Sequence, residues 1–559
     1  MELVRQRSTA EAPDGASVEV SVRPTAGGFG WRVANTGAAP VPVRSVSVVH
    51  TVRGVSGRMR MFSHGYQSWS RTGLVRPGVD EDPSSVANLE LLVMWHHADP
   101  GRVPAGQLRS ELVTVLADDH DAVLVGFLGG DLHDGTLRLG HGRSGNELIV
   151  EAFLGDAVLA PGEERDLHEV VIRPTDDPVG ALDAWATECG RRSGARTRAP
   201  YQVGWCSWYH YFEHVTERSF RSNLSLARDW PFDVFQLDDG FQAQVGDWTE
   251  TDESFPSGLQ AVADDVAAAG MRPGLWIAPF VVAPASELAI RHPEWIARFP
   301  DGSPLIAHYN EHWGGFVHAL DTSHPGVIEH LEQLARDLVA MGFTYLKLDF
   351  TYAPGFDGRW HDPSLTPAQR VRAGYDAIRR GAGDDAFILG CGAPLGACIG
   401  VVDGMRIGPD VAPWWEPKPE LWPYPGYEGT IPATLNAYRN TLTRAHQHRR
   451  LWLNDPDCLM LRTTDTDLSQ EQVRAWALAV AASGGMALVS DDLALLDDGA
   501  RELLDEVVRV GRTVDDAART GPAPRCEDLM TAETPTTLQA GGIRFEGVPR
   551  PGSAHLRVD

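Results

Sequence analysis

Several short apolar runs in the middle of the chain end in an Asp, a Trp or a Lys/Asp pair. The clearest of them are Gly204–Phe212, Phe235–Gly240, Gly274–Pro279, Tyr345–Phe350 and Arg406–Asp410. Such runs are typical of buried strands whose ends aim reactive side chains into one pocket. Aromatic faces together with several carboxylates, and with no convincing metal cluster, favour a sugar as the ligand. The pattern therefore predicts a carbohydrate site assembled from strand ends.

The pair Lys347 and Asp349 carries the strongest chemical signal. The two residues share parity in one apolar run, so in a strand both side chains point to the same side. An ammonium beside a carboxylate lowers the pKa of that carboxylate and keeps it ionised, as a nucleophile or a base requires. The 49 basic residues include only two lysines, Lys347 and Lys418. A site that needs a compact ammonium cannot exchange it for arginine, so we predict a site role for Lys347.

A second carboxylate, Asp410, ends a different run after the turn-forming pair Gly408-Pro409. A higher pKa there would let Asp410 act as an acid, and two carboxylates in separate roles make the usual pair of a glycosidase. The competing interpretation is that Asp residues at strand ends only cap turns or helices. The combination of Lys-x-Asp with a second Asp favours a catalytic role over a capping role.

Two further acids, Asp238 and Asp239, are adjacent at the end of a run. Successive strand side chains alternate, so we expect one carboxylate to face the pocket and the other to contact it from the rim. Both would accept hydrogen bonds from vicinal sugar hydroxyls; a divalent metal is the competing use. We favour sugar, and expect no metal and no cofactor. Trp208 and Trp276 suit a platform under a sugar ring, whereas Trp205 is expected in the core.

The composition limits the partners and the compartment. A net charge of −27 argues against nucleic acid or an anionic membrane as partner. The first 17 residues contain no apolar stretch of the signal-peptide kind, and no window has 18 consecutive apolar residues. The six cysteines are scattered, with no CxxC pair, so neither a disulfide framework nor a zinc site is expected. We predict a cytoplasmic protein, while the oligomeric state stays undetermined.

The element pattern divides the chain into four parts and predicts a multidomain α/β plus β protein. Residues 1–177 alternate in short segments between turns and predict an N-terminal β-sandwich, and 178–200 predict a helical linker. Residues 201–514 alternate strand and helix eight times, which indicates a central (β/α)8 TIM barrel. Residues 515–559 predict a small C-terminal β domain. An open doubly wound sheet is the alternative, but the Gly-rich phosphate turn typical of it is missing.

The eight barrel strands and five of the helices can be placed by residue. The helices are expected at 216–229, 326–341, 367–381, 432–448 and 469–483. The strands are expected to end near Trp208, Asp238, Pro279, Asp349, Gly392, Asp410, Asp455 and Asp491.

The strand-end motifs together resemble glycoside hydrolase family 36, the α-galactosidases, in its compact bacterial form. The motifs follow the family's order from residue 204 to residue 457. They are Gly-Trp-Cys-Ser-Trp-Tyr-His-Tyr-Phe (204–212), Leu-Asp-Asp (237–239), Leu-Trp-Ile-Ala-Pro-Phe (275–280), Lys-Leu-Asp-Phe (347–350), Gly-Cys-Gly-Ala-Pro (390–394), Arg-Ile-Gly-Pro-Asp (406–410) and Leu-Asn-Asp-Pro-Asp (453–457).

The resemblance implies retaining hydrolysis of terminal α-D-galactosides, an α-galactoside oligosaccharide or glycoside being the substrate. Asp349 would be the nucleophile and Asp410 the acid/base. Asp238 and Asp239 would hold the 4- and 6-hydroxyls of galactose. The other implied site residues are Lys347, Cys391 and Arg406 on the ring hydroxyls, Trp208, Tyr209 and Trp276 around the pocket, and Trp69 from the N-terminal domain.

The chain departs from the family pattern at Gly240-Phe241, in the loop after Asp349 and in its short tail. Leaving-group contacts are therefore not inferred. An α-galactosyl transglycosylase or an α-N-acetylgalactosaminidase would use the same site, and a non-catalytic carbohydrate-binding protein is the alternative from another class. The intact Lys347, Asp349 and Asp410 argue against that last alternative.

Overall fold

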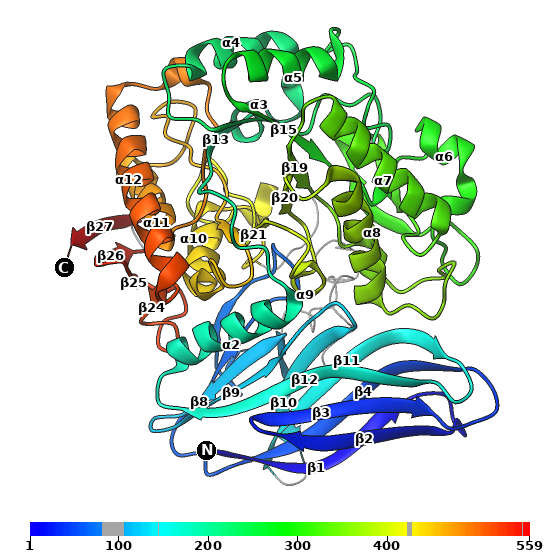
Figure 1. Ribbon diagram of the computed structural model, residues 1–559. Coiled ribbons are helices and arrows are strands. Elements are labelled where there is room, and N and C mark those ends of the chain that lie inside the picture. The colour runs from blue at the N-terminus through cyan, green and yellow to red at the C-terminus, as the bar shows by residue number, and fades with distance from the viewer. Residues whose placement is uncertain (81–105, 143–144, 422–427, 550–551, 559) are drawn as a thin grey trace.

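The protein is described by a computed structural model that covers residues 1–80, 106–142, 145–421, 428–549 and 552–558. An antiparallel region, a parallel barrel and a small antiparallel sheet follow one another along the chain (Figure 1). This is the predicted fold class: a central TIM barrel with an N-terminal β-sandwich and a small C-terminal β unit. The residue limits of the four predicted domains stay predictions.

Two antiparallel sheets form the N-terminal region. The first has the order β1 (Glu2–Glu11), β4 (Val41–Arg53), β11 (Gly145–Leu159), β10 (Asp134–Gly142) and β7 (Leu108–Glu111). The second has the order β2 (Val18–Thr25), β3 (Gly28–Asn35), β12 (Glu164–Thr175), β9 (Ala122–Phe127), β8 (Val113–Ala117), β5 (Arg60–Ser63) and β6 (Gly73–Val75).

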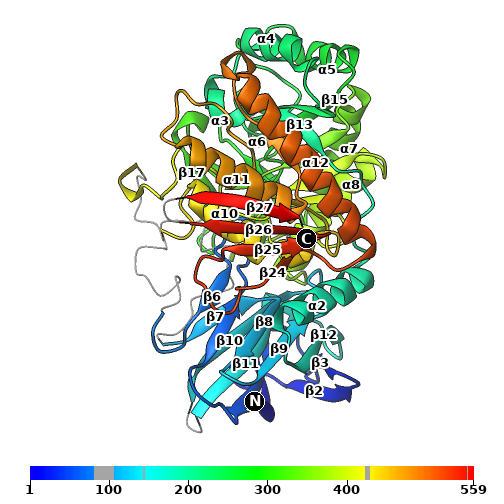
Figure 2. The same cartoon turned by 90° about the vertical axis from the view of Figure 1, so that its left-hand side faces the viewer.

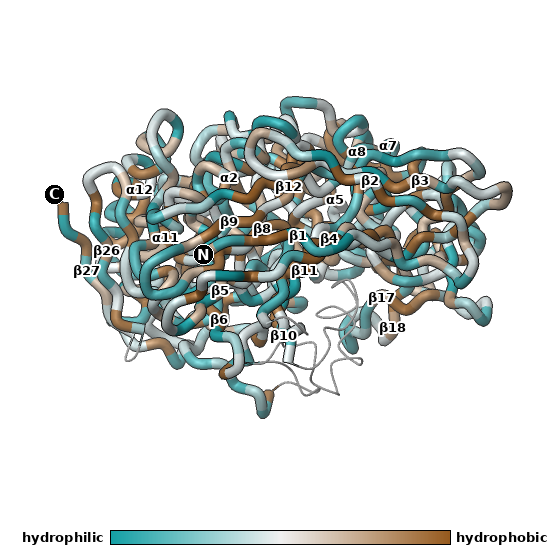
Figure 3. The backbone as a smooth tube through the Cα atoms, turned by 90° about the horizontal axis from the view of Figure 1, so that it is seen from below, coloured by the Kyte–Doolittle hydropathy of each residue, from teal (hydrophilic) through white to brown (hydrophobic). Residues whose placement is uncertain are grey.

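Alternating side chains give the two sheets a shared core. In β2, Val18, Val20 and Val22 pack against this core, while Glu19 and Ser21 between them are exposed. Figure 3 shows the same alternation of hydrophobic and hydrophilic colour along the strands of the sandwich. A period of two buries one face of each sheet and leaves the other in water, as a sandwich requires.

Eight parallel strands build the barrel, and neighbours in sequence are neighbours in space. They are β13 (Val203–Cys206), β14 (Val234–Leu237), β15 (Arg272–Ile277), β19 (Tyr345–Leu348), β20 (Phe387–Gly390), β21 (Gly404–Arg406), β22 (Leu453–Asp455) and β23 (Ala487–Val489). Strand β23 pairs with β13, and the Met486 amide donates to the Asn454 carbonyl at 3.0 Å across the remaining seam. All eight strands lie where the sequence predicts them.

Helices surround the barrel (Figure 1). They include α4 (Glu217–Ala227), α5 (Gly258–Ala268), α7 (Pro325–Ala340), α8 (Pro367–Ala382), α10 (Thr434–Thr443), α11 (Gln470–Ser483) and α12 (Asp498–Thr520). Capping boxes begin α4, α8 and α11, in which a side chain satisfies backbone amides that have no partner in the first turn. The five helices expected from the sequence are present; α5 and α12 were not among them.

An insertion between β15 and α7 adds a short antiparallel sheet beside the barrel mouth. Its strands are β16 (Val281–Val282), β18 (Gly315–Ala319) and β17 (Ile306–Asn310), and the 3-10 turn Glu311–Trp313 joins the last two. The insertion also contains α6 (Glu287–Arg291). This sheet was not predicted from the sequence, and it places Trp313 near Asp239.

The C-terminal strands form a four-stranded sheet that packs on α11, as Figure 2 shows. They are β24 (Arg525–Cys526), β25 (Thr537–Ala540), β26 (Ile543–Val548) and β27 (Ser553–Val558). Helix α2 (Pro178–Ser193) links the sandwich to the barrel (Figure 1). Among the described residues, no helix has both the length and the apolarity needed to cross a membrane.

Candidate active site

The predicted site residues of the barrel gather at the C-terminal ends of its strands. This is the end at which (β/α)8 enzymes place their functional groups. Each residue lies within one of these strands or a few residues after it. Trp276, Lys347 and Arg406 lie within β15, β19 and β21, whereas Trp208 and Tyr209 follow β13, Asp238 and Asp239 follow β14, Asp349 follows β19, Cys391 follows β20 and Asp410 follows β21.

Asp349 is held in place through both carboxylate oxygens. The indole Nε1 of Trp276 donates to Oδ2 at 3.0 Å, and the Phe350 amide donates to Oδ1 at 2.8 Å. The Lys347 ammonium lies 3.9 Å from Oδ2. Trp276 is fully buried, so it positions this carboxylate with its edge and does not offer the open ring face expected from the sequence. Fixed donors on a buried carboxylate pre-orient it for attack on a bound atom.

The principal ion-pair partner of Lys347 is Asp238. Its Nζ lies 2.9 Å from Asp238 Oδ2, closer than the 3.9 Å to Asp349. The sequence placed the ammonium beside Asp349 because the two share a strand face, but β15 lies between β14 and β19 and the barrel brings Asp238 across it. Burial alone would lower the pKa of Lys347, yet the charges of Asp238 and Asp349 raise it well above its ordinary value. The lysine is therefore a permanent cation on the floor of the site.

Asp239 is bound by two side chains that were not predicted from the sequence. Gln242 Nε2 donates to Oδ1 at 2.6 Å, and Trp313 Nε1 donates to Oδ2 at 2.9 Å. Burial raises the pKa of Asp239 to about 7; these hydrogen bonds oppose the shift, and the charges of Asp238 and Asp349 add to it. Both acids of the pair are buried, and the expected division into one pocket-facing and one rim carboxylate stays a prediction.

Asp410 has the environment of an acid. Burial raises its pKa to about 7, and the charges of Asp457 and Asp349 add to that effect, while Arg406 and Lys347 oppose it. Arg406 Nη1 donates to Oδ1 at 3.0 Å. The side chain is nevertheless 34% exposed, so its carboxyl can be reached from solvent. Near neutral pH this group can give and take a proton.

Arg406 is shared among three carboxylates. Besides Asp410, it contacts Asp455 through Nε at 3.0 Å and Asp457 through Nη2 at 2.7 Å. The register of β21 and β22 places Asp455 directly opposite Arg406. The family resemblance implies that Arg406 contacts ring hydroxyls, which stays a prediction; in the structure its guanidinium contacts the three acids.

Cys391, Trp208 and Tyr209 are the remaining predicted site residues of the barrel. The Cys391 thiol is fully buried, and burial followed by the charge of Asp349 raises its pKa well above the ordinary value, so it stays neutral. Trp208 begins helix α3 (Trp208–Tyr211) and remains partly exposed. Tyr209 is buried, and its hydroxyl donates to Asp457. Trp208 is thus available to a ligand, whereas the Tyr209 hydroxyl is committed to the protein.

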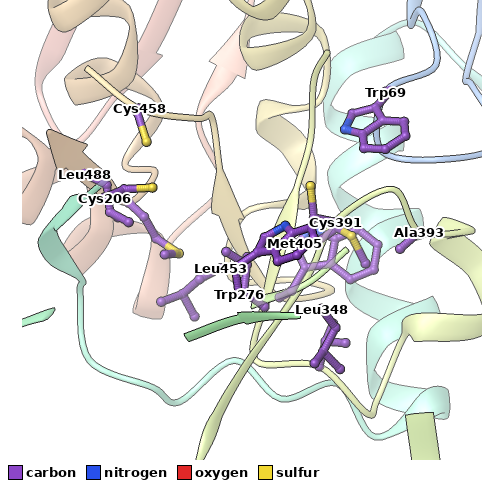
Figure 4. Packing of buried hydrophobic residues seen from close by; sticks show 14 of the residues in the cluster. Trp69, Cys206, Trp276, Leu348, Cys391, Ala393, Met405, Leu453, Cys458 and Leu488 are labelled. Atoms are coloured by element: carbon purple, nitrogen blue, oxygen red, sulfur yellow. The ribbon is translucent and has the colours of Figure 1, made fainter. Parts of the chain in front are cut away.

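The N-terminal domain contributes Trp69 to the site. The neighbouring Ser68 amide donates to the Ala393 carbonyl at 3.0 Å, and the Ala393 amide donates to Ser68 Oγ at 3.1 Å. Figure 4 shows Trp69 on the side of Cys391 and Ala393, with Cys206 and Cys458 on the opposite side of the cluster. The ring centroids of Trp69 and Phe350 are 5.3 Å apart, so the indole lies beside the residue that follows Asp349.

Gly392 makes this close approach possible. Its φ is +49°, and a Cβ there would lie 2.7 Å from the Trp69 ring and 3.0 Å from Asp349 Oδ1. We expect Gly392→Ala to lower kcat/KM by about 100-fold, since a misplacement of about 1 Å in the site can cost that much. Gly383→Ala is the matched control, because Gly383 also has a positive φ but has open space around its Cβ position. Equal kcat/KM of the two variants would contradict this expectation.

The family model and the curated proteins that this chain resembles are described as melibiase or α-galactosidase. The sequence profile of the Melibiase family matches residues 203–353. α-Galactosidase AgaA of Geobacillus stearothermophilus is 25% identical over 261 residues, which are 43% of this chain and 34% of that protein. α-Galactosidase 2 of Pediococcus pentosaceus is 29% identical over 178 residues, 30% of this chain and 24% of that protein. The chain thus spans 34% or less of the length of these curated relatives.

Solved structures match over nearly the whole chain. TtGalA, an α-galactosidase from Thermus thermophilus in complex with p-nitrophenyl α-D-galactopyranoside, superposes with a TM-score of 0.68 at 27% identity, covering 95% of this chain and 98% of that one. The GH36 α-galactosidase AgaA from Geobacillus stearothermophilus has a TM-score of 0.62 at 14% identity, covering 97% and 73%, and shares the fold. With its strand-end motifs and its barrel, the chain is similar to the melibiase family and to these α-galactosidases.

Proposed function

We propose that this protein is a retaining exo-α-galactosidase, which removes terminal α-D-galactosyl residues from oligosaccharides or glycosides. The observation that carries the proposal is the contrast between two carboxylates. Asp349 is oriented by Trp276 and the Phe350 amide, whereas Asp410 has a pKa raised to about 7 by burial and by neighbouring acids. A fixed carboxylate and a proton-carrying carboxylate are the two groups that a retaining glycosidase needs.

The proposed reaction has two displacements. Asp349 attacks the anomeric carbon and forms a galactosyl ester, while the bond to the leaving oxygen breaks and Asp410 gives that oxygen its proton. Asp410, now ionised, takes a proton from water, whose oxygen attacks the anomeric carbon and displaces Asp349. Two inversions release galactose in the α configuration.

The substrate class is supported by the relatives and by the site. Structures of the Thermus thermophilus enzyme hold p-nitrophenyl α-D-galactopyranoside and stachyose. In this chain Asp238, Asp239 and Lys347 form a buried group of two acceptors and a donor beside Asp349. We assign Asp238 and Asp239 to the 4- and 6-hydroxyls of galactose, with Lys347 and Cys391 next to the ring. A neutral sugar is also compatible with the net charge of −27.

Activity should decline as the pH rises through about 7. Asp410 must be protonated to assist departure of the leaving group, and its pKa is raised to about 7. Below that pH the acid is present, and above it the acid is progressively lost, so the alkaline limb of kcat/KM should lie near pH 7. A pH profile with p-nitrophenyl α-galactoside measures this limb. A limb near pH 4 would contradict the assignment of Asp410 as the acid.

The deciding assay compares p-nitrophenyl α-galactoside with the α-glucoside and the α-N-acetylgalactosaminide, and follows the first anomer by NMR. Turnover of the galactoside with α-galactose appearing first is the expected result. Preference for the N-acetylgalactosaminide would replace the proposal with an α-N-acetylgalactosaminidase. Transfer products that dominate when a sugar acceptor is added would indicate a transglycosylase. β-Galactose as the first product would overturn the retaining mechanism.

We further propose a cytoplasmic location. All six cysteines lie within the described residues, and each is buried and unpaired. Buried thiols without disulfides suit a reducing compartment. Recovery of the activity in the extracellular or periplasmic fraction of the native cells would contradict this.

A further inference from the structure

Asp457 is a buried acid in the site with no role in the two displacements. It follows β22 and Pro456, and its side chain is fully buried. Its backbone has a φ of +97°, which is rare and strained for any residue other than glycine. A surrounding network has to hold such a conformation in place, so the contacts of its carboxylate show what that network fixes.

The Asp457 carboxylate accepts three hydrogen bonds and forms one ion pair. Oδ2 accepts one from the Tyr209 hydroxyl and one from the Val411 amide, the latter at 2.9 Å. Oδ1 accepts from the Cys458 amide at 2.7 Å and lies 2.7 Å from Arg406 Nη2. The acid therefore ties together the segments after β13, β21 and β22.

Two of these contacts reach Asp410 directly. Val411 is the next residue after Asp410, so the bond from its amide holds the peptide that carries the Asp410 side chain. Arg406 contacts Asp457 through Nη2 and Asp410 through Nη1. The Arg406 guanidinium thus forms ion pairs with Asp410, Asp455 and Asp457, so the three acids share its positive charge.

We propose that Asp457, held by the Tyr209 hydroxyl, is the positioning residue of Asp410: it aims the Asp410 carboxyl through Val411 and through the Arg406 guanidinium that both acids contact. The inference rests on the proposed function, in which Asp410 is the acid/base. Asp457 acts only through Asp410 and Arg406 and does not touch the sugar.

The charge of Asp457 affects the pKa of Asp410 in a definite direction. Asp457 and Asp349 disfavour the ionised form of Asp410, whereas Arg406 and Lys347 favour it. Tyr209 and Cys391 also face Asp410 and are neutral. Burial and the neighbouring acids raise the pKa of Tyr209 well above its ordinary value, so its hydroxyl remains a donor to Asp457. When the charge of Asp457 is removed, Asp410 loses a like-charged neighbour and gains a larger share of Arg406. Its proton then leaves at lower pH.

The test uses Asp457→Asn and Tyr209→Phe in the full-length protein. Asn keeps the shape and removes the charge, and we expect the alkaline limb of kcat/KM to move down by about one pH unit. Tyr209→Phe keeps the ring but removes the donor, so Asp457 takes up a proton more easily and the limb moves the same way by a smaller amount. At pH 7.5 the loss should be about tenfold larger for an α-galactosyl disaccharide than for 2,4-dinitrophenyl α-galactoside, whose leaving group needs no proton.

Two control variants separate this role from general damage. Asp403→Asn removes a buried carboxylate paired with Arg196 and Arg379, at the opposite end of the strand that carries Arg406. Tyr211→Phe removes a hydroxyl that is bound by Asn223, away from Asp410. Both controls should keep the wild-type limb. If Asp457→Asn shows no thermal unfolding transition, the variant is not folded, and the pH profile of Tyr209→Phe alone tests the positioning role.

The failure of this inference differs from the failure of the proposed function. An active wild type whose limb and leaving-group dependence are unchanged in Tyr209→Phe and in folded Asp457→Asn would overturn the positioning role alone. A wild type that hydrolyses none of the galactosides would overturn the proposed function, and this inference with it.

Discussion

Replacing Asp349 by alanine is expected to lower kcat for p-nitrophenyl α-galactoside on the order of 10⁴-fold, as for other residues of a catalytic group. The variant lacks the oxygen that would form the galactosyl ester. The fold should survive, because Asp349 follows β19 and its main contacts are with other site groups, Trp276 and the Phe350 amide. Steady-state kinetics and thermal unfolding measure both expectations.

Azide provides the second arm of this experiment. A small anion can enter the space left by the carboxylate and attack the same face of the anomeric carbon, so the product should be β-galactosyl azide. Asp385→Ala is the matched control, since Asp385 is exposed just before β20 at the other end of the barrel. Near wild-type turnover in Asp349→Ala would reject this residue as the nucleophile, and so would rescue that yields the α-azide.

Replacing Arg444 by methionine is expected to destabilise the protein by about 3 kcal/mol or more and to abolish most of its activity. The guanidinium is fully buried and donates to five carbonyls, four in the segment 65–70 and one at Ile407, at 2.7–3.2 Å. Burial, together with the charge of Arg439, lowers the pKa of Arg444 to about 9, which leaves it charged at pH 7. Methionine fills the space but leaves these buried carbonyls unpaired.

The loss of activity would follow from the position of Trp69. The segment 65–70 carries this side chain to Asp349, and Arg444 is the cation that connects the segment to the backbone after β21. Apparent Tm and kcat/KM should therefore fall together. Arg336→Met is the control, because Arg336 lies on the exposed face of α7 and pairs with Glu332. Full activity in a destabilised Arg444→Met would show that the segment keeps its place without the cation.

The barrel could be predicted from the sequence for a local reason. Each strand is a short apolar run, each is followed by a functional side chain, and the helical segments between them carry their own caps, as at Thr366 and Ser469. These signals depend only on neighbours along the chain. The insertion with β17 and β18 was missed because its short strands carry little periodic signal, and Trp313 was missed with it.

The pairing of charges within the site could not be predicted. The spacing of Lys347 and Asp349 places both on one strand face, but the distance to Asp238 depends on the order and stagger of β14, β15 and β19. Arg444 gave no signal, because an arginine in a helical segment usually faces solvent. It becomes a buried link only when the segment 65–70 folds onto the barrel.

The sequence by itself determined which side chains stand at the strand ends, and therefore the fold class and the pool of acids, aromatics and cations available for chemistry. The alternation of side chains along a strand and the spacing of the motifs are fixed by the covalent chain, so they are the same in any parallel barrel. Only the tertiary structure decided which acid keeps a proton. The pKa values of Asp239 and Asp410 depend on burial and on charges from other strands, which no distance along the chain encodes.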